Sequence, residues 1–267
     1  MVKIQDSDPD QPLQLDISGH VATVILNRPD KKNAVTHAMW RDIGFMFRNF
    51  ANDKNLRAVL IAGAGADFCA GADIGEFDAV RGNEATARDY EAANEEAFSA
   101  IRDCPVPVIA AIRGVCFGGG FGIAAAADIR IATKEAMFSV PAARLGLAYP
   151  VAAMADIVNS VGPQMAKLLT FSADRIDAET ARKAGFLLEI IDDGSLESRA
   201  TDLASRIAAN APLSVKASKA SIRSVLSGAA EDYAKAEELG AQTFDSRDYA
   251  EGRAAFAERR PPKFSGN

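Results

Sequence analysis

Apolar and polar residues follow each other in the first part of the chain in patterns that predict short β-strands. Residues 13–17 alternate, Gly19 and His20 turn the chain, and a β-branched run follows over residues 21–26. This order predicts a β-hairpin. Short segments rich in apolar residues, which we expect to form further strands, cover residues 58–62, 106–112, 128–132, 137–140 and 187–191.

Segments with apolar residues at helical spacing lie between these runs, and only such segments are found in the last part of the chain. The first follows Thr36, a residue type that caps helix N-termini, and the last four follow Gly194 with no strand between them. The expected helices cover residues 36–52, 81–102, 123–127, 151–161, 163–169, 177–184, 196–210, 212–227, 229–243 and 248–258. Strands that alternate with helices place the chain in the α/β class with mostly parallel pairing.

Three regions follow from this pattern. We expect a flexible lead-in over residues 1–12, a core of strands and helices over residues 13–195, and an all-helical region over residues 196–267. The helical region is expected to pack on the core or on another subunit, because its helices carry apolar positions that need a partner.

A glycine-rich stretch from Val115 to Gly122 lies between the apolar run 106–112 and an alanine-rich helical segment. At such a junction, backbone N–H groups and the positive end of the helix dipole suit an anion or a developing oxyanion. The glycines could equally serve only to relieve crowding where a strand turns into a buried helix. The stretch by itself does not decide between these interpretations.

Another loop, residues 63–74, follows a buried strand and consists almost wholly of small residues. It precedes the glycine-rich stretch in the chain and is called the first loop below. Small residues allow another molecule to lie against the backbone, whereas the alternative is simple flexibility. Loops at strand ends carry function disproportionately often, so we favour a binding loop.

Composition and charge narrow the function classes. The chain has 267 residues, of which 48% are hydrophobic, and its net charge is −6. An acidic chain lacks the basic face that nucleic-acid binding requires, so we expect no nucleic-acid partner. No apolar window is long enough to span a membrane and the N-terminus does not resemble a signal peptide, so we expect a cytoplasmic protein without a membrane partner. With three cysteines at unsuitable spacing and two histidines, we expect no metal site.

Several segments, in this order and spacing, resemble the enoyl-CoA hydratase/isomerase (crotonase) superfamily over nearly the whole chain from about Leu13. The matching segments are Leu26–Pro29 with Asn33 and Ala34, Phe68–Ile74, Gly114 with Gly118–Gly120, Asp128–Ala132, Phe138 with Pro141, Leu145 and Gly146, Val161–Pro163, Ala208 with Asn210–Pro212, and Ser246–Phe256.

The resemblance implies a fold and an assembly. The fold is the ClpP/crotonase spiral of ββα units, here residues 13–195 with the acyl-CoA site, finished by a helical trimerisation region at 196–267. It implies a homotrimer, or a hexamer formed as a dimer of trimers. The implied substrate is an acyl-CoA thioester of fatty acid metabolism, with coenzyme A as part of the substrate and no separate cofactor.

The resemblance also implies site residues. Two backbone N–H groups, of Ala70 and Gly119, form an oxyanion hole for the thioester carbonyl. Basic residues before the first loop meet the CoA phosphates, and two tail residues reach the CoA of a neighbouring subunit. The residues implied to bind substrate or CoA are Arg28, Lys31, Lys32, Ala70, Gly71, Ala72, Asp73, Ile74, Gly119, Phe256 and Lys263.

The chain departs from the family at the positions of the hydratase glutamates. Hydratases place one glutamate two residues after the glycine triplet and another after the proline of the Phe138–Pro141 segment. These positions are Gly122 and Ala142 here, and neither residue can transfer a proton. Asp73 and Glu76 are expected to order the first loop instead of transferring protons.

Tyr149 and Arg144 are the remaining candidates for a catalytic side chain. Decarboxylases of malonyl-type CoA esters in this family also lack both glutamates and carry a tyrosine in a similar Leu145–Tyr149 context. They carry a histidine where this chain has Ala72. Tyr149 could instead be an aromatic residue packed on the core, and Arg144 a structural ion-pair partner.

Several functions are therefore open. An enoyl-CoA hydratase-like lyase that stabilises an enolate is the expected class. Decarboxylation, thioester hydrolysis and an atypical isomerisation are alternative reactions within it. A non-catalytic acyl-CoA-binding protein is the alternative of another class, whereas RNA binding is disfavoured by the acidic balance.

Overall fold

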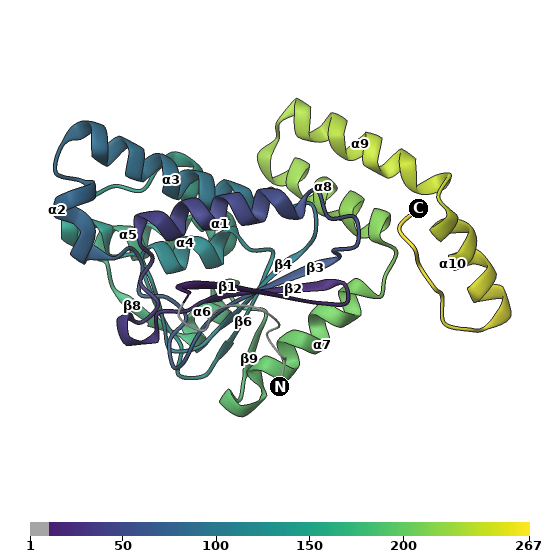
Figure 1. Cartoon of the computed structure of the whole chain (residues 1–267), viewed down its shortest axis with the longest axis horizontal. Helices are drawn as coiled ribbons and strands as arrows, with labels where there is room; N and C mark the ends of the chain where they lie inside the picture. The colour runs from purple at the N-terminus through teal and green to yellow at the C-terminus, as the bar shows by residue number, and fades with distance from the viewer. Residues whose placement is uncertain (1–10) are drawn as a thin grey trace.

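The computed structural model describes residues 11–267, so the expected flexible lead-in over residues 1–12 lies almost wholly outside the described residues. A six-stranded sheet of order β1-β2-β3-β4-β6-β9 forms the centre (Figure 1). Its first two strands form the expected antiparallel hairpin, and all later neighbours pair in parallel. The strands are β1 (Leu13–Ser18), β2 (Val21–Leu26), β3 (Ala58–Gly63), β4 (Val108–Ile112), β6 (Ile129–Thr133) and β9 (Glu189–Ile191).

A second, three-stranded sheet carries the glycine-rich turn. It consists of β5 (Val115–Phe117), β7 (Met137–Ser139) and β8 (Arg175–Asp177). The sequence analysis placed residues 115–117 in the turn itself and expected the run 106–112 to feed it. That expectation was wrong, because residues 115–117 pair with β7 and so attach the turn to the smaller sheet.

Helices cover both faces of the large sheet because successive residues of a strand point to opposite sides. Val59 and Ile61 of β3 join the core under α1 (His37–Phe50), α3 (Glu84–Arg102), α4 (Gly119–Ala126) and α5 (Val151–Ser172). Ala58 and Leu60 pack instead against α7 (Leu196–Ala208) on the other face. The first helix of the predicted oligomerisation region is therefore a layer of the core.

Local sequence signals fix the ends of the main helices. The Thr36 side chain accepts a hydrogen bond from the Met39 N–H and caps α1, as expected. Asn83 and Thr86 form a capping box, so α3 begins at Glu84 and not at the expected Arg81. The break expected before Pro163 is present as non-helical backbone at Gly162 within α5. The short elements are η1 (Pro29–Lys31), η2 (Ile74–Glu76), α2 (Phe77–Val80), η3 (Pro141–Leu145), α6 (Ala178–Lys183) and η4 (Asp193–Ser195).

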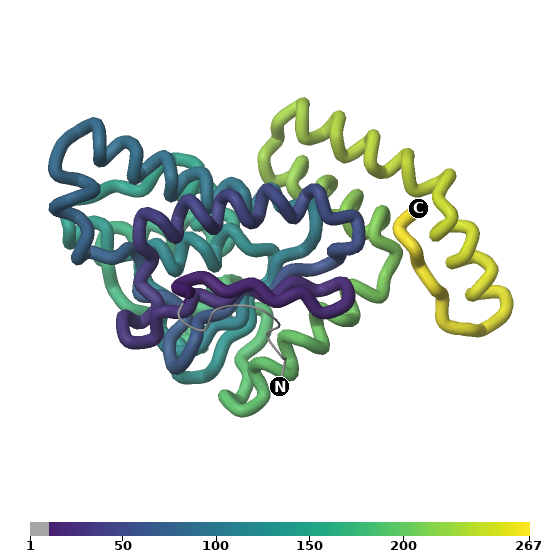
Figure 2. Tube along the Cα trace, viewed as in Figure 1, coloured from purple at the N-terminus to yellow at the C-terminus, as the bar shows by residue number. Residues whose placement is uncertain are grey.

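The last three helices form an arm on one side of the molecule, opposite α2 and α3 (Figure 1). They are α8 (Pro212–Ser227), α9 (Ala230–Phe244) and α10 (Arg247–Glu258), close to the expected bounds. The chain after α10 folds back along that helix (Figure 2), where Asp248 accepts hydrogen bonds from the N–H groups of Ser265 and Gly266. Large apolar side chains are exposed on the arm, among them Ile222, Val225, Leu226, Tyr233, Phe244, Tyr249 and Phe256.

Candidate active site

The small-residue loop and the glycine-rich turn lie against each other. The Cys69 N–H donates to the Val115 carbonyl, and the Phe117 N–H donates to the Cys69 carbonyl, both at 2.9 Å. Gly71 adopts φ +106°, and a methyl group built on it would lie 3.2 Å from the Gly119 nitrogen. Only glycine combines this backbone angle with so close an approach, so the two loops meet because both are rich in small residues.

Asn33 holds the first loop in place from a fully buried position. Its side-chain amide donates to the carbonyls of Ala64 (2.9 Å) and Asp67 (2.7 Å), and its oxygen accepts from the Arg28 N–H (2.8 Å). Asn33 has φ +55°, a left-handed conformation that asparagine tolerates better than most residues. One side chain thereby ties the chain before α1 to the loop after β3.

Helix α4 begins at the glycine-rich turn and is fixed at its other end by a half-buried arginine. Arg130 donates from Nη1 to the carbonyls of Ala124 (3.1 Å) and Ala127 (2.5 Å) at the end of the helix, where the Ala124 carbonyl also accepts from the Ala127 N–H. A cation at this end also favours the helix dipole. The N-terminal end of α4, with its own unpaired N–H groups, is thus held at the turn.

Two backbone N–H groups at the meeting of the loops have no acceptor. Among the hydrogen bonds of residues 11–267, none uses the N–H of Ala72 or of Gly119. A methyl group built on Gly119 would lie 3.5 Å from the Ala72 nitrogen, so the two groups are neighbours. Unpaired N–H groups beside each other at a helix N-terminus suit a developing oxyanion.

The Ala70 N–H, predicted to form the oxyanion hole with the N–H of Gly119, donates to the Lys32 carbonyl at 2.8 Å and is therefore not a free donor. The unpaired N–H group of this loop beside Gly119 is that of Ala72, two residues later.

A pocket opens beside these N–H groups, with about 720 Å³ of space that includes its opening to solvent. Its walls are mostly apolar. It brings together seven positions singled out from the sequence as binding, catalytic or missing-glutamate positions: Ala70, Gly71, Ala72, Ile74, Gly119, Ala142 and Tyr149. The other lining residues are Phe77, Arg81, Glu91, Asn94, Phe98, Gly118, Pro141, Leu145, Leu147, Ala148 and Pro150.

Tyr149 is half-buried and lies between the core and the glycine-rich turn. Its ring packs against the core, and its hydroxyl lies 3.8 Å from a methyl group built on Gly118. Burial, with a contribution from the charge of Glu91 among others, raises the pKa of Tyr149 well above its usual value. The hydroxyl therefore stays protonated at neutral pH and can donate a hydrogen bond, but it is a poor base.

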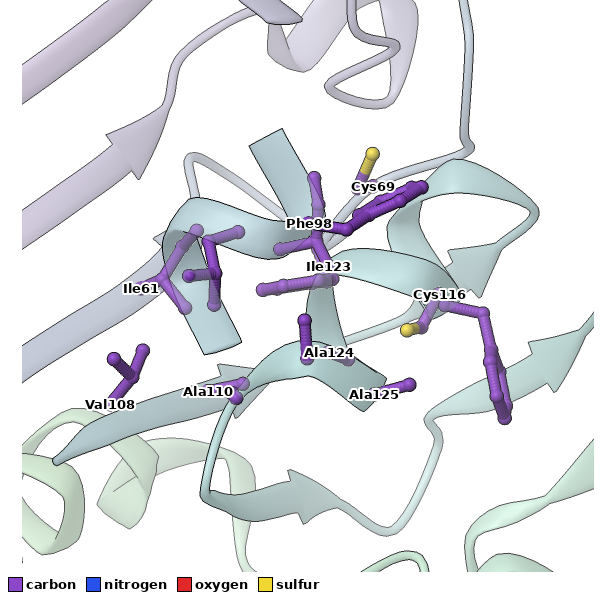
Figure 3. Packing of buried hydrophobic residues seen from close by; sticks show 14 of the residues in the cluster. Ile61, Cys69, Phe98, Val108, Ala110, Cys116, Ile123, Ala124 and Ala125 are labelled. Carbon is purple, nitrogen blue, oxygen red and sulfur yellow. The ribbon is translucent and has the colours of Figure 1, made fainter. Parts of the chain in front are cut away.

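The space in front of Gly122 is filled by a side chain from α3. A methyl group built on Gly122 would lie 2.7 Å from Phe98 Cζ. Figure 3 shows Phe98 among the side chains packed with Ile123 of α4. Phe98 therefore occupies the space that a glutamate side chain at position 122 would need.

The sequence analysis did not single out Arg81 and Glu91, which bring opposite charges into the pocket. Arg81 Nη2 lies 2.6 Å from Glu91 Oε1, and the guanidinium carbon lies 4.4 Å and 4.5 Å from the ring centres of Phe77 and Tyr90. Burial raises the pKa of Glu91, and the charge of Arg81 only partly opposes this. Glu91 is one of several acidic residues on α3, so no sequence signal distinguished it.

Other predicted residues lie outside this pocket. Arg28 pairs with Asp73 (2.8 Å) and donates to the Ala34 carbonyl (2.6 Å). Burial alone would raise the pKa of Asp73, but the hydrogen bond and charge of Arg28 and the Gly75 N–H lower it on balance.

Asp73 also caps η2, and Glu76 accepts from the His37 N–H, so both order the loop as expected. Lys31 and Lys32 are exposed.

Arg144 and the tail residues are not brought to the pocket within one chain. Arg144 is exposed on η3. Phe256 is 88% exposed on α10, and Lys263 lies in the segment that folds back along that helix, on the other side of the molecule from α2 and α3 (Figure 1).

Comparison with known proteins decides the family. The family model described as enoyl-CoA hydratase/isomerase matches residues 16–267. The chain belongs to the enoyl-CoA hydratase/isomerase family. A structure of an enoyl-CoA hydratase/carnithine racemase from Magnetospirillum magneticum is 34% identical, with a TM-score of 0.90 over 99% of this chain and 98% of that one. A family protein from Hyphomonas neptunium gives a TM-score of 0.92 at 33% identity, over 98% and 100%. The predicted crotonase fold is confirmed.

Curated relatives in the enoyl-CoA hydratase/isomerase family differ in their reactions. The carnitinyl-CoA dehydratase of Proteus mirabilis is 34% identical, over 96% of this chain and 99% of its own length. The mitochondrial Delta(3,5)-Delta(2,4)-dienoyl-CoA isomerase of Mus musculus is 35% identical over 75% of this chain, which spans 64% of that relative. Both are acyl-CoA enzymes by name, so membership supports the predicted substrate class and leaves the reaction open.

The described residues show neither a metal-binding cluster nor a membrane-spanning helix. In the described part of the chain, no group of three or more histidine, cysteine, aspartate or glutamate residues is arranged to hold a metal ion. Within residues 11–267, no helix combines the length and apolar character needed to cross a bilayer.

Proposed function

We propose that this protein acts on an acyl-CoA thioester through its enolate, with the carbonyl oxygen held by the N–H groups of Ala72 and Gly119. The observation that carries this proposal is the pair of neighbouring, unpartnered N–H groups beside the pocket. The oxygen gains negative charge as the enolate forms, so fixed donors stabilise the transition state more than the bound substrate. The apolar walls of the pocket suit the acyl group.

The coenzyme A part is proposed to lie along the first loop, from Ala70 to Ile74. Arg28 supports this loop through its ion pair with Asp73, whereas the exposed Lys31 and Lys32 are the cations offered to the phosphates. We further propose a homotrimer, or a hexamer built from two trimers, in which Phe256 and Lys263 serve a neighbouring subunit. The exposed apolar side chains of α8, α9 and α10 support self-association.

Among the reactions of this family, a shift of a double bond fits this site better than hydration. Addition of water requires one group to activate the water and another to deliver a proton to carbon. Positions 122 and 142 supply neither, and Phe98 closes the space in front of Gly122. A double-bond shift through the enolate requires a single group that removes a proton and returns it.

Decarboxylation of a malonyl-type ester is the second candidate. It is favoured by Tyr149, a neutral donor beside Gly118, because an enolate formed by loss of CO2 needs only a held carbonyl and a proton donor. It is disfavoured by Ala72, where the family's decarboxylases carry a histidine.

A panel of esters tests the proposal. The purified protein is incubated with 3-enoyl-CoA, crotonyl-CoA, methylmalonyl-CoA and aryl-acyl-CoA esters, and products are separated and weighed by mass spectrometry. We expect 3-enoyl-CoA to give the 2-enoyl isomer of unchanged mass, and crotonyl-CoA to gain no water. Rapid hydration of crotonyl-CoA would contradict the proposed reaction, and binding of every ester without any turnover would indicate an acyl-CoA-binding protein.

A further inference from the structure

We propose that Glu91 is the catalytic residue that moves the proton in this site, with Arg81 as its positioning residue. The inference rests on the enolate chemistry proposed above and identifies the proton carrier that the family's usual positions do not supply. Four observations carry it: the makeup of the pocket wall, the arrangement of α3, the pocket shared with the oxyanion donors, and the surroundings of the carboxylate.

The pocket wall offers few groups that can accept a proton. Of the described residues that line it, Glu91 is the one carboxylate and Arg81 the one cation. Tyr149 is held protonated by burial. Cys69 belongs to the first loop, but its side chain is fully buried, and burial raises the pKa of its thiol to about 12. Glu91 alone combines access to the pocket with a basic group at neutral pH.

Helix α3 presents Glu91, Asn94 and Phe98 to the pocket. Their spacing of three and four residues places them on one face of the helix. Phe98 fills the room in front of Gly122, so α3 both removes the space for a carboxylate on α4 and supplies its own carboxylate from the same face. Asn94 is fixed between them, because its side chain donates to the Tyr90 carbonyl at 2.7 Å.

The Glu91 side chain lines the same pocket as Ala72, Gly119 and Tyr149. The Tyr149 hydroxyl lies beside Gly118 in the glycine-rich turn. The carboxylate and the oxyanion donors therefore border one pocket, into which the acyl group would extend.

Arg81 fixes the carboxylate in orientation. Its guanidinium lies over the rings of Phe77 and Tyr90 and forms an ion pair with Glu91, which restricts both side chains. Burial outweighs the charge of Arg81 and raises the pKa of Glu91. A pKa nearer to the working pH suits a group that must both accept and return a proton. The titratable and charged groups around this pair are Glu76, Tyr90 and Tyr149.

The reaction step balances with these groups alone. A Glu91 oxygen forms a bond to a proton of the acyl chain as the C–H bond breaks. The electron pair moves through the conjugated carbons to the thioester oxygen, held by Ala72 and Gly119. The carboxylic acid of Glu91 then returns the proton to the carbon at the other end of the conjugated system. The double bond has moved, and Glu91 is a carboxylate again.

The test compares Glu91→Gln, Glu91→Asp and the control Glu95→Gln, which lies on the same helix and is exposed. Deuterium uptake into 3-enoyl-CoA from D2O is followed by mass spectrometry, and binding is measured calorimetrically with an unreactive thioether analogue of the ester. We expect E91Q to lose at least about 100-fold in uptake, with binding within about threefold of the wild type because glutamine still accepts a hydrogen bond from Arg81. E91D should recover part of the uptake with its acidic pH limb displaced, and E95Q should match the wild type.

The outcomes separate this inference from the proposal beneath it. If the wild type takes up deuterium and E91Q does so within about threefold, Glu91 is not the proton carrier, although the enolate chemistry stands. If E91Q loses binding in parallel with uptake, its role is structural and the inference is overturned. If the wild type binds the analogue but takes up no deuterium, the proposed function itself fails.

Discussion

Replacing Gly71 by alanine is expected to lower kcat/KM for an acyl-CoA substrate by about 10²- to 10³-fold, the usual effect of losing one oxyanion donor. The new methyl group would lie 3.2 Å from the Gly119 nitrogen and 3.0 Å from the Phe117 carbonyl oxygen. It would therefore stand between the substrate carbonyl and one of its two donors. Steady-state kinetics on the best ester of the panel gives the measurement.

A matched glycine substitution controls for this change. Gly194 has open space around a built methyl group and no left-handed backbone angle, so Gly194→Ala is expected to leave activity unchanged. Gly71→Ala also forces alanine into φ +106°, which costs about 1–3 kcal/mol of stability, so thermal unfolding is recorded to show that the variant is folded. A folded G71A protein with wild-type kcat/KM would refute the use of this pair of N–H groups.

Restoring the family's glutamate at position 122 is expected to damage the protein without creating a hydratase. Gly122→Glu places a side chain against Phe98, whose ring atoms lie 2.7 Å and 2.8 Å from a built methyl group. Overpacking of this kind costs about 1–3 kcal/mol, and a carboxyl group placed in the buried core adds to the cost. We expect a lowered Tm and no hydration of crotonyl-CoA.

The cause of this loss is tested by removing Phe98 as well. Phe98→Ala alone should destabilise the protein by leaving a cavity, but it makes room for the glutamate. In a double-mutant cycle, G122E should therefore cost at least about 1 kcal/mol less in the F98A background than in the wild type. Denaturant unfolding of the four proteins measures this coupling. Additive effects of the two substitutions would show that Phe98 does not block position 122.

Sequence reasoning reached the fold because its local signals and the family pattern agree. Residues close together in the sequence predict the hairpin around Gly19, the Thr36 cap and the helices after Gly194. The structure confirms all three features. Strand β5 was missed because its three residues begin the glycine-rich stretch and were assigned to the turn. So short a run has no periodicity of its own, and pairing with β7 makes it a strand.

The candidate site was harder to predict from the sequence than the fold, for two physical reasons. Whether the N–H of Ala70 or of Ala72 is free depends on the Lys32 carbonyl, which lies far away in the sequence and adjacent in space. Glu91 is one of several acidic residues along a helix expected to be largely solvated, and nothing in its neighbours marks it. Its partner Arg81 precedes the helix and reaches it only because α2 brings the chain back against α3.

The most direct measurement of the central claim is a crystal structure of the protein with an unreactive acyl-CoA analogue that retains the carbonyl group. The account predicts that the carbonyl oxygen lies about 2.7–3.2 Å from the nitrogens of both Ala72 and Gly119, with the acyl chain directed toward Glu91. A carbonyl oxygen bound elsewhere, with either N–H group left unpaired or hydrogen-bonded only to water, would contradict the account.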